Sequence, residues 1–507
     1  MSSSVDNEYG IRPVVSLKPN IRTTGYGLSG VWNMELDEFM DLIPSKANEP
    51  VLGDGMKAVY WTNSNNGTGE TTSNSFTSAM YDYTMGNGRT DSKDSKWANA
   101  ITEDGSYWVW IPRYAYKITY TNENKTAKSG QTTSTATIDE TKTQYGNIDI
   151  LFMDGTSNTH YRDLYGNPQP LPAGYKVHPA FQAMEAATAT TSGDAELGNP
   201  LGKWNEELEG IWVAKYEASR EDLVNGNWVA YEDQSTCGGG NKATSTTIRM
   251  VSKPSRLSWR AITEKNIYAN SLNMYENLGS HEMKNSEWGA VAYLAQSAYG
   301  RNGNEIGINQ NYLGLYTDGT EIPRYTGAGP GGTADVQGTM YEYDATFEST
   351  YAWNTTQGKK ASTTGNIYGV YDLNGGAWEY MAGYVNNGHS YLASQGGTLT
   401  DATNMHTKQV YKASATDGAS DTRAANYALN SGVYGDAVYE TSTSSASSSG
   451  SWNGDYSYFP CAGSPFFERG GGGYSGSNAG AFTFHSTHGG ADYYSGFRTV
   501  LSFVSGT

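Results

Sequence analysis

The residues from 468 to 503, ERGGGGYSGSNAGAFTFHSTHGGADYYSGFRTVLSF, carry side chains suited to binding another molecule. Two anchors, Arg469-Gly470-Gly471 and Gly496-Phe497-Arg498, bracket a stretch of Ser, Asn, Tyr, Phe, His and Thr interspersed with Gly and Ala. Tyr and His offer flat amphipathic contact area, and Ser and Asn offer adaptable hydrogen bonds. This mixture predicts a recognition surface, although a Gly-rich loop without a special role has a similar composition.

The side chains within this stretch divide into two groups. Phe482 and Phe484 are two residues apart, so in a strand both point to the same side. Their apolar character predicts that both point inward. The remaining polar and aromatic residues are the predicted ligand-binding set: Tyr474, Ser477, Asn478, His485, His488, Asp492, Tyr493 and Tyr494.

Catalytic residues are not evident in the chain. His485 and His488 could ligate a metal ion, but no third ligand follows at a suitable spacing. No Ser-His-Asp order and no pair of carboxylates stands out. Cys237 and Cys461 are too far apart for a metal knuckle, and they form either one disulfide or two buried thiols. We therefore expect no enzymatic activity, no metal and no cofactor.

The composition excludes several classes of partner. The chain has 507 residues, enough for two or three domains, and a net charge of −18. This charge argues against nucleic acid or an anionic membrane as a partner. Only 17% of the residues are charged, and Gly, Ser, Thr, Asn and Tyr replace them. Such a composition is typical of loop-rich and β-rich extracellular or virion proteins.

No apolar run reaches transmembrane length, and no basic-then-apolar leader follows Met1. These features favour a protein that leaves the cell by lysis, or by another route, over a secreted adhesin.

The elements that must position these residues can be predicted from periodicity. Apolar spacing predicts helices over 32–43, 258–275 and 286–297, the first ended by Pro44. Short strands are expected over 51–110, including 107–111, and a further strand over 210–216. Residues 121–147 are a polar insertion, and residues 441–451 are a Ser-rich stretch expected to form a mobile loop. The chain after Arg301 reads as short strands and long Gly-rich loops.

The two ends of the chain resemble each other. YGIRPVVSL at 9–17 matches SGFRTVLSF at 495–503 in Gly, Arg, Val and Ser, and three further positions keep apolar character. The match is either coincidence or a strand from a second copy of the same domain type. We expect residues 11–15 to form a strand beside 497–503 or on a neighbouring subunit, with Pro13 at an edge.

Six ordered motifs resemble the formylglycine-generating-enzyme type of C-type-lectin fold. They are YWVWIPRYAYKI (107–118), HPAF (178–181) with GIWVAKYEAS (210–219), NSEWGAVAYLAQ (285–296), GNIYGVYDLNGGAWEY (365–380), and the R-G-G and G-F-R anchors. The resemblance implies a scaffold in which Trp259, Trp288 and Trp378 fill the junction of helices and sheet. It also implies a Glu379–Arg498 ion pair and a tight turn of positive φ at Gly375 and Gly376.

Departures from the family pattern bear on activity. The copper-dependent oxidases of this family need two thiols near the C-terminal segment, and residues 469–498 contain no cysteine. The H-x3-H-x-E motif of the iron-dependent relatives is absent as well. At the tight turn, Gly376 stands where the family has Asn, and the loss of that side-chain oxygen weakens the case for bound calcium. At the start of the helix over 286–297, Lys284 stands where the family has a capping Thr, so Asn285 would have to cap the helix. The segment GSNAGAFTF (476–484) is similar to that of the non-catalytic variable proteins of diversity-generating retroelements, which include phage receptor-binding tips and bacterial surface display proteins.

These observations predict an α+β protein with a C-type-lectin-like recognition domain, residues 105–507, that carries long loop insertions. Residues 1–104 are expected to form a β-rich N-terminal attachment region. The expected function is receptor binding by a phage tail fibre or tail tip, in the virion or on an extracellular surface. Expected partners are a host cell-surface glycan or protein, other virion or appendage proteins, and further copies of the chain. The alternatives are a structural subunit of a surface appendage or capsid decoration and, third, a formylglycine-type oxidase.

Overall fold

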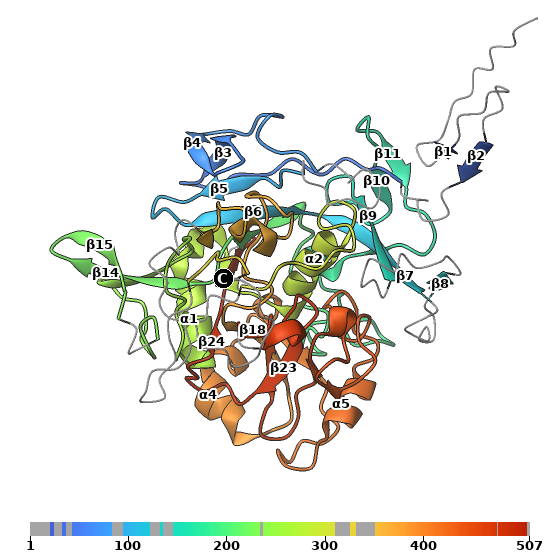
Figure 1. The fold of residues 1–507 in the computed structure, drawn as a ribbon. Coiled ribbons are helices and arrows are strands. Elements are labelled where there is room, and N and C mark those ends of the chain that lie inside the picture. Colours follow the sequence, from blue (N-terminus) through green and yellow to red (C-terminus); the bar gives the residue numbers. More distant parts are fainter. Residues whose placement is uncertain are drawn as a thin grey trace, which may run out of the picture.

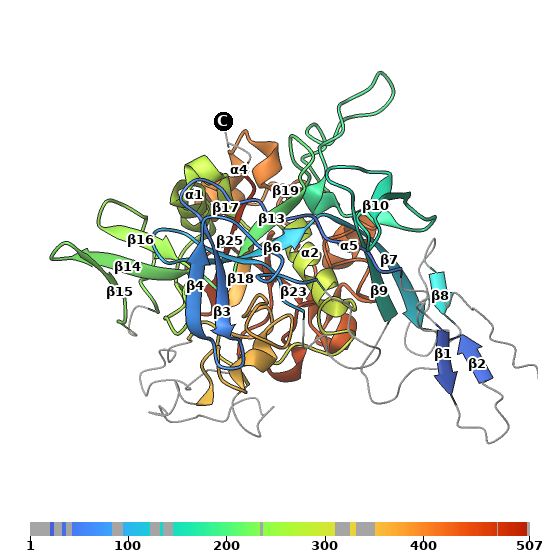
Figure 2. The same cartoon turned by 90° about the horizontal axis from the view of Figure 1, so that it is seen from above.

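The chain folds as an α+β protein, seen in two views in Figures 1 and 2. The structure is a computed structural model. It describes residues 43–83, 95–121, 146–233, 237–309, 325–330, 350–473 and 475–503, and the backbone of 21–24, 33–36 and 132–134. Segment 9–17, for which a strand is predicted, lies outside these residues. No helix among the described residues is long and apolar enough to span a bilayer.

A seven-stranded antiparallel sheet forms the centre of the molecule, in the order β17-β25-β13-β6-β5-β3-β4. The aromatic and β-branched run at β6 and the run at β13 lie side by side, with Trp110 opposite Trp212, and this confirms both predicted strands. The bounds are β3 Lys57–Asn63, β4 Thr68–Ser73, β5 Asn99–Ile101, β6 Tyr107–Pro112, β13 Gly210–Ala214, β17 Ser280–Glu282 and β25 Thr499–Leu501.

This sheet crosses the predicted boundary between residues 104 and 105. Strand β5 lies before the boundary and β6 after it, yet the two are hydrogen-bonded neighbours, with Ala100 opposite Trp108. Trp97 and Trp108 are both buried in the main core. The strands β3, β4 and β5 therefore extend the central sheet instead of standing apart from it.

Two helices, α1 Glu264–Met274 and α2 Asn285–Gln296, lie between the upper strands of Figure 1 and the C-terminal strands. Every residue of α2 is buried, and its predicted range is confirmed to within one residue. The N-terminus of α2 is capped differently from our prediction. The Glu287 carboxylate accepts a hydrogen bond from the Lys284 N–H (2.9 Å), whereas the Asn285 side chain contacts Arg469.

A second sheet carries the C-terminal segment, in the order β19-β18-β22-β23-β21-β20, and β24 also pairs with β18. Strand β18 is buried along its whole length, so this sheet is a rigid base for the residues attached to it. The bounds are β18 Trp378–Val385, β19 Gln409–Tyr411, β20 Ala446–Ser447, β21 Ser457–Tyr458, β22 Phe466–Arg469, β23 Phe484–Thr487 and β24 Ser495–Gly496.

Smaller sheets surround these two. One contains β7 Tyr114–Thr121, β8 Thr132–Ser134, β9 Gly146–Phe152 and β12 Lys176–Val177. Another contains β14 Ser219–Val224, β15 Asn227–Ala230 and β16 Ile248–Val251, and its β14–β15 hairpin projects from the body in both views. Two further hairpins are β10 His160–Arg162 with β11 Pro168–Pro170, and β1 Ile21–Thr24 with β2 Asn33–Leu36.

Two predictions of secondary structure near the chain's start and middle are wrong in part. Residues 33–36 form β2 rather than helix, because polar and apolar residues alternate there and the segment pairs with β1. The helix predicted from residue 258 begins only at Glu264, since Trp259 donates its backbone N–H to Ala218 and Ala261 has a φ of 56°.

The chain after Arg301 contains the helices α4 Ser390–Thr400 and α5 Arg423–Leu429, where only strands and loops are predicted from the sequence. Two adjacent glycines, Gly396 and Gly397, have low helix propensity, so the sequence of α4 does not predict a helix. The two ends of the Ser-rich stretch 441–451 are packed, whereas its middle is exposed or half-buried. Thr441, Ser442 and Ser451 are buried, and the Ser442 and Ser451 hydroxyls donate to the carbonyl oxygens of Val438 and Thr441.

Candidate recognition surface

The first anchor of the C-terminal segment is a buried arginine. The Arg469 guanidinium donates to Asn285 Oδ1 (3.2 Å) and to the carbonyl oxygens of Asp436 and Ala437 (2.9 Å each). Burial lowers the pKa of Arg469 to about 10, which still leaves it charged at neutral pH. All of these partners lie inside the protein, so this anchor holds the segment and does not contact a ligand.

The second anchor is Phe497 with Arg498. Phe497 packs beside Trp259, with 6.0 Å between ring centroids. The Arg498 Nε lies 2.6 Å from Glu379 Oε2, and both side chains are fully buried. This geometry confirms the predicted ion pair. The positive φ predicted at Gly375 and Gly376 is confirmed too, at 80° and 70°.

Trp288 of α2 connects the two anchors. Its ring centroid lies 5.6 Å from the Arg469 guanidinium and 5.9 Å from that of Arg498. Its indole N–H donates to the carbonyl oxygen of Ala481, between the anchors (2.7 Å). One buried side chain therefore fixes both ends and one interior point of the segment.

The segment between the anchors points its apolar side chains inward. Phe482 and Phe484 are both buried, as predicted, and Phe482 packs on Trp452 with 5.3 Å between ring centroids. Strand β23 pairs with β22, so that Phe484 lies opposite Arg469 and His485 opposite Glu468. The backbone of the segment is held by a core that these residues share with α2 and β22.

Tyr493 and Tyr494 combine a fixed backbone with exposed side chains. The Tyr493 carbonyl oxygen accepts from Arg260 Nη1 (2.7 Å), and that of Tyr494 accepts from the Trp378 N–H (2.9 Å). Their side chains remain 51% and 41% exposed, among the most exposed large hydrophobic residues of the described chain. A partner would therefore meet two tyrosines on a backbone that is already ordered.

His485 lies in an aromatic cluster with Trp378, Tyr456 and Tyr458. Its ring centroid is 5.1 Å from that of Trp378 and 5.3 Å from that of Tyr458. Burial, and then the charge of Arg423, lower the pKa of His485 to about 4, so the ring is neutral at physiological pH. A neutral imidazole between the buried Trp378 and the half-buried Tyr456 and Tyr458 offers stacking area and hydrogen bonds without charge.

A second group surrounds His488. Its Nδ1 lies 3.7 Å from Asp492 Oδ2, and both side chains are about two-fifths exposed. The His488 ring is 5.6 Å from that of Tyr391, which in turn is 4.6 Å from that of His389. This group adds the Asp492 carboxylate as a hydrogen-bond acceptor and further aromatic area next to Tyr493 in the chain.

The remaining predicted residues differ in how accessible their side chains are to a ligand. Ser477 is exposed on the short 3-10 helix η7 Gly476–Asn478. The Asn478 amide donates to the carbonyl oxygens of Ser448 (2.6 Å) and Gly454 (3.0 Å), so its donors already tie η7 to the neighbouring loop. Tyr474 lies outside the described residues.

The structure also brings residues from between β18 and β22 to this surface, and the set predicted from the sequence does not include them. Tyr391 belongs to α4, Tyr458 belongs to β21, and Tyr456 precedes β21, which pairs with β23. The alternation Tyr456-Ser457-Tyr458 has the same Tyr and Ser composition as the predicted segment, and this is the signal that could have revealed it. We call the set His485, His488, Asp492, Tyr493, Tyr494, Tyr391, Tyr456 and Tyr458 the aromatic face.

A buried carboxyl lies under the aromatic face. Glu468 contacts the Ser495 hydroxyl, and its Oε2 is 3.9 Å from His485 Nδ1. Burial raises the pKa of Glu468 to about 8. Among the described residues, no group of three His, Cys, Asp or Glu side chains has the arrangement of a metal site. Cys237 and Cys461 are separate thiols, the first buried and the second half-buried.

Comparisons with known proteins give little further information. No model of a protein family matches the chain, and no curated protein matches it. One solved structure, titled Major Tropism Determinant I1 Variant, is 13% identical to the chain. The similarity covers 90% of this chain and 74% of that one, with a TM-score of 0.27. A score this low carries no argument about fold or function.

Proposed function

We propose that the protein is a non-catalytic recognition protein with a C-type-lectin-like fold, and that it binds a host surface from a phage tail fibre or tail tip. The aromatic face is its ligand-contacting surface. The observation that supports this proposal best is the contrast between the fixed backbone at 493–494 and the exposed side chains that this backbone carries.

The chemistry of the face favours binding over catalysis. Its side chains are tyrosine and histidine with one carboxylate, and such aromatic contacts often contribute about 2 kcal/mol or more each at an interface. The two buried arginines that anchor the segment, Arg469 and Arg498, make their hydrogen bonds inside the protein. The expected partner is a cell-surface glycan or protein, and several copies of the chain on one fibre would raise the avidity by about 10² to 10⁴.

A double substitution, Tyr493→Ala with Tyr494→Ala, tests the proposal. We expect adsorption of the fluorescently labelled protein to a panel of bacterial strains to be abolished, while the melting temperature changes little. The matched control is Tyr165→Ala, which removes a tyrosine that is 90% exposed on the β10–β11 turn. Wild-type adsorption by the double variant, or equal loss in the control, would contradict the assignment of the aromatic face.

A further inference from the structure

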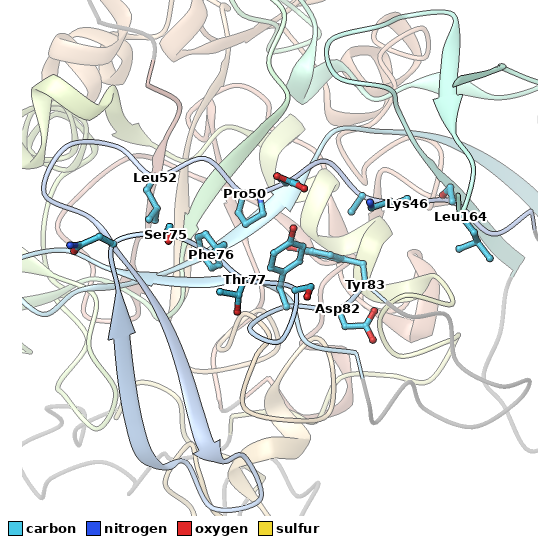
Figure 3. Close-up of a pocket in the computed structure, with 15 residues that line it drawn as sticks. Lys46, Pro50, Leu52, Ser75, Phe76, Thr77, Asp82, Tyr83 and Leu164 are labelled. Carbon is cyan, nitrogen blue, oxygen red and sulfur yellow. The ribbon is translucent and has the colours of Figure 1, made fainter. Parts of the chain in front are cut away.

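An open cavity of about 760 Å³ lies in the N-terminal part of the described chain. Three separate segments line it, residues 45–52, residues 74–83, and Leu164 in the turn between β10 and β11. In Figure 3, Leu52 and Ser75 lie at one end of the cavity, Leu164 lies at the other, and Pro50 and Phe76 lie between. The cavity is thus elongated, and its volume is within the range of roughly 300 to 1,000 Å³ that is common for ligand sites.

The floor of the cavity is aromatic and rigid. Phe76 stacks on the buried Trp212, with ring centroids 6.0 Å apart and an interplanar angle of 20°. Tyr81 meets Phe76 edge to face at 5.7 Å, and the Tyr83 hydroxyl donates to the carbonyl oxygen of Trp110 (2.6 Å). The rings of Phe76 and Tyr81 are only half-buried, so part of each ring faces the cavity.

The rim of the cavity is polar. Asn74, Thr77 and Ser78 are exposed and supply an amide and two hydroxyls. Glu49 and Asp82 are exposed carboxylates on two different segments. A molecule on the aromatic floor would therefore meet donors and acceptors around its edge.

This combination fits a neutral sugar. The C–H face of a sugar ring packs on an aromatic ring, and its hydroxyls donate to carboxylates and amides at the edge. An anionic sugar would be repelled by Glu49 and Asp82 and by the net charge of −18. Lys46, an exposed ammonium group on the same wall as Glu49, offsets part of this negative charge.

We propose that this cavity binds a short neutral oligosaccharide and is a second site, separate from the aromatic face. The two sites are built from different parts of the chain. The segments that line the cavity flank β3 and β4 of the central sheet, which are drawn in the upper part of Figure 1, whereas β23 of the aromatic face is drawn in the lower part. The inference is independent of the proposed function of the aromatic face.

An array of neutral and sialylated oligosaccharides of two to four units, probed with the whole chain, tests this proposal, and the best neutral binder is then titrated calorimetrically. We expect Tyr81→Ala to weaken the binding of that oligosaccharide at least tenfold. The pair Glu49→Gln with Asp82→Asn, which keeps the shape of the cavity, should weaken it about fivefold. The matched control Tyr60→Ala removes a half-buried tyrosine of β3 that does not line the cavity, and it should bind like the wild type.

Three results would overturn the proposal. One is an array on which no neutral oligosaccharide binds, or on which only sialylated sugars bind. Another is binding that Tyr81→Ala leaves unchanged in a protein of normal melting temperature. The third is binding that the Tyr493→Ala, Tyr494→Ala variant abolishes, since the sugar would then occupy the aromatic face.

Discussion

Arg498 sits among more carboxyls than one guanidinium can neutralise. Besides Glu379, the buried carboxyls of Asp372 and Glu217 interact with it, and burial raises the pKa of all three. Replacing Arg498 with Met leaves these groups without a countercharge, and we expect a loss of about 3 to 5 kcal/mol in the free energy of unfolding at neutral pH.

The loss of unfolding free energy caused by Arg498→Met should be smaller at pH 5, because the carboxyls around Arg498 can then take up protons in the folded protein. Urea denaturation at pH 5 and pH 8 measures both values. A cost that is the same at both pH values would mean that Arg498 acts through packing alone.

Glu468 makes a separate contribution to the pH dependence of stability. Its pKa of about 8 in the folded protein exceeds the ordinary value of about 4.5, so the folded state binds more protons between these two pH values. The stabilisation that Glu468 contributes is therefore fully present below about pH 4.5 and is lost as the pH rises to about 8. We expect Glu468→Gln to flatten this dependence by up to about 1.4 kcal/mol per pH unit, measured by thermal denaturation across pH 5 to 8. An unchanged slope would show that Glu468 is ionised in the folded protein.

Helix α4 contains two adjacent glycines in different surroundings. A Cβ on Gly396 would lie 2.4 Å from Cζ of the buried Phe466, whereas a Cβ on Gly397 would meet nothing closer than 3.9 Å. We expect Gly396→Ala to destabilise the protein by about 1 to 3 kcal/mol through overpacking. Gly397→Ala should stabilise it by about 0.5 to 1 kcal/mol, because alanine favours the helix. Equal effects of the two substitutions on chemical denaturation would show that α4 does not pack on β22 in this way.

The whole molecule depends on the sheet that crosses residues 104 and 105. Removing residues 1–104 would take away β3, β4 and β5 and expose Trp108 and its neighbours in the core. We expect this truncation to aggregate, and a truncation of residues 1–42 to fold, as judged by circular dichroism and size-exclusion chromatography. A soluble 105–507 fragment with a cooperative melting transition would instead support the boundary that the sequence predicts.

Local patterns in the sequence determined those features that depend on local physics. The apolar runs of β6 and β13 follow from β-branched and aromatic residues, and the helical spacing of α2 follows from a periodicity of 3.6 residues. Phe482 and Phe484 point inward because they are apolar, although Phe482 precedes β23. The positive φ at Gly375 and Gly376 follows from the conformations that only glycine adopts easily.

The tertiary structure alone decided which distant segments meet. Helix α4 forms although it contains Gly396 and Gly397, because Phe466 packs against a position without a side chain. Tyr456 and Tyr458 join His485 because β21 pairs with β23, and β5 joins β6 across the predicted boundary. Such pairings depend on the packing of residues far apart in the chain, and no periodicity within a single segment records them.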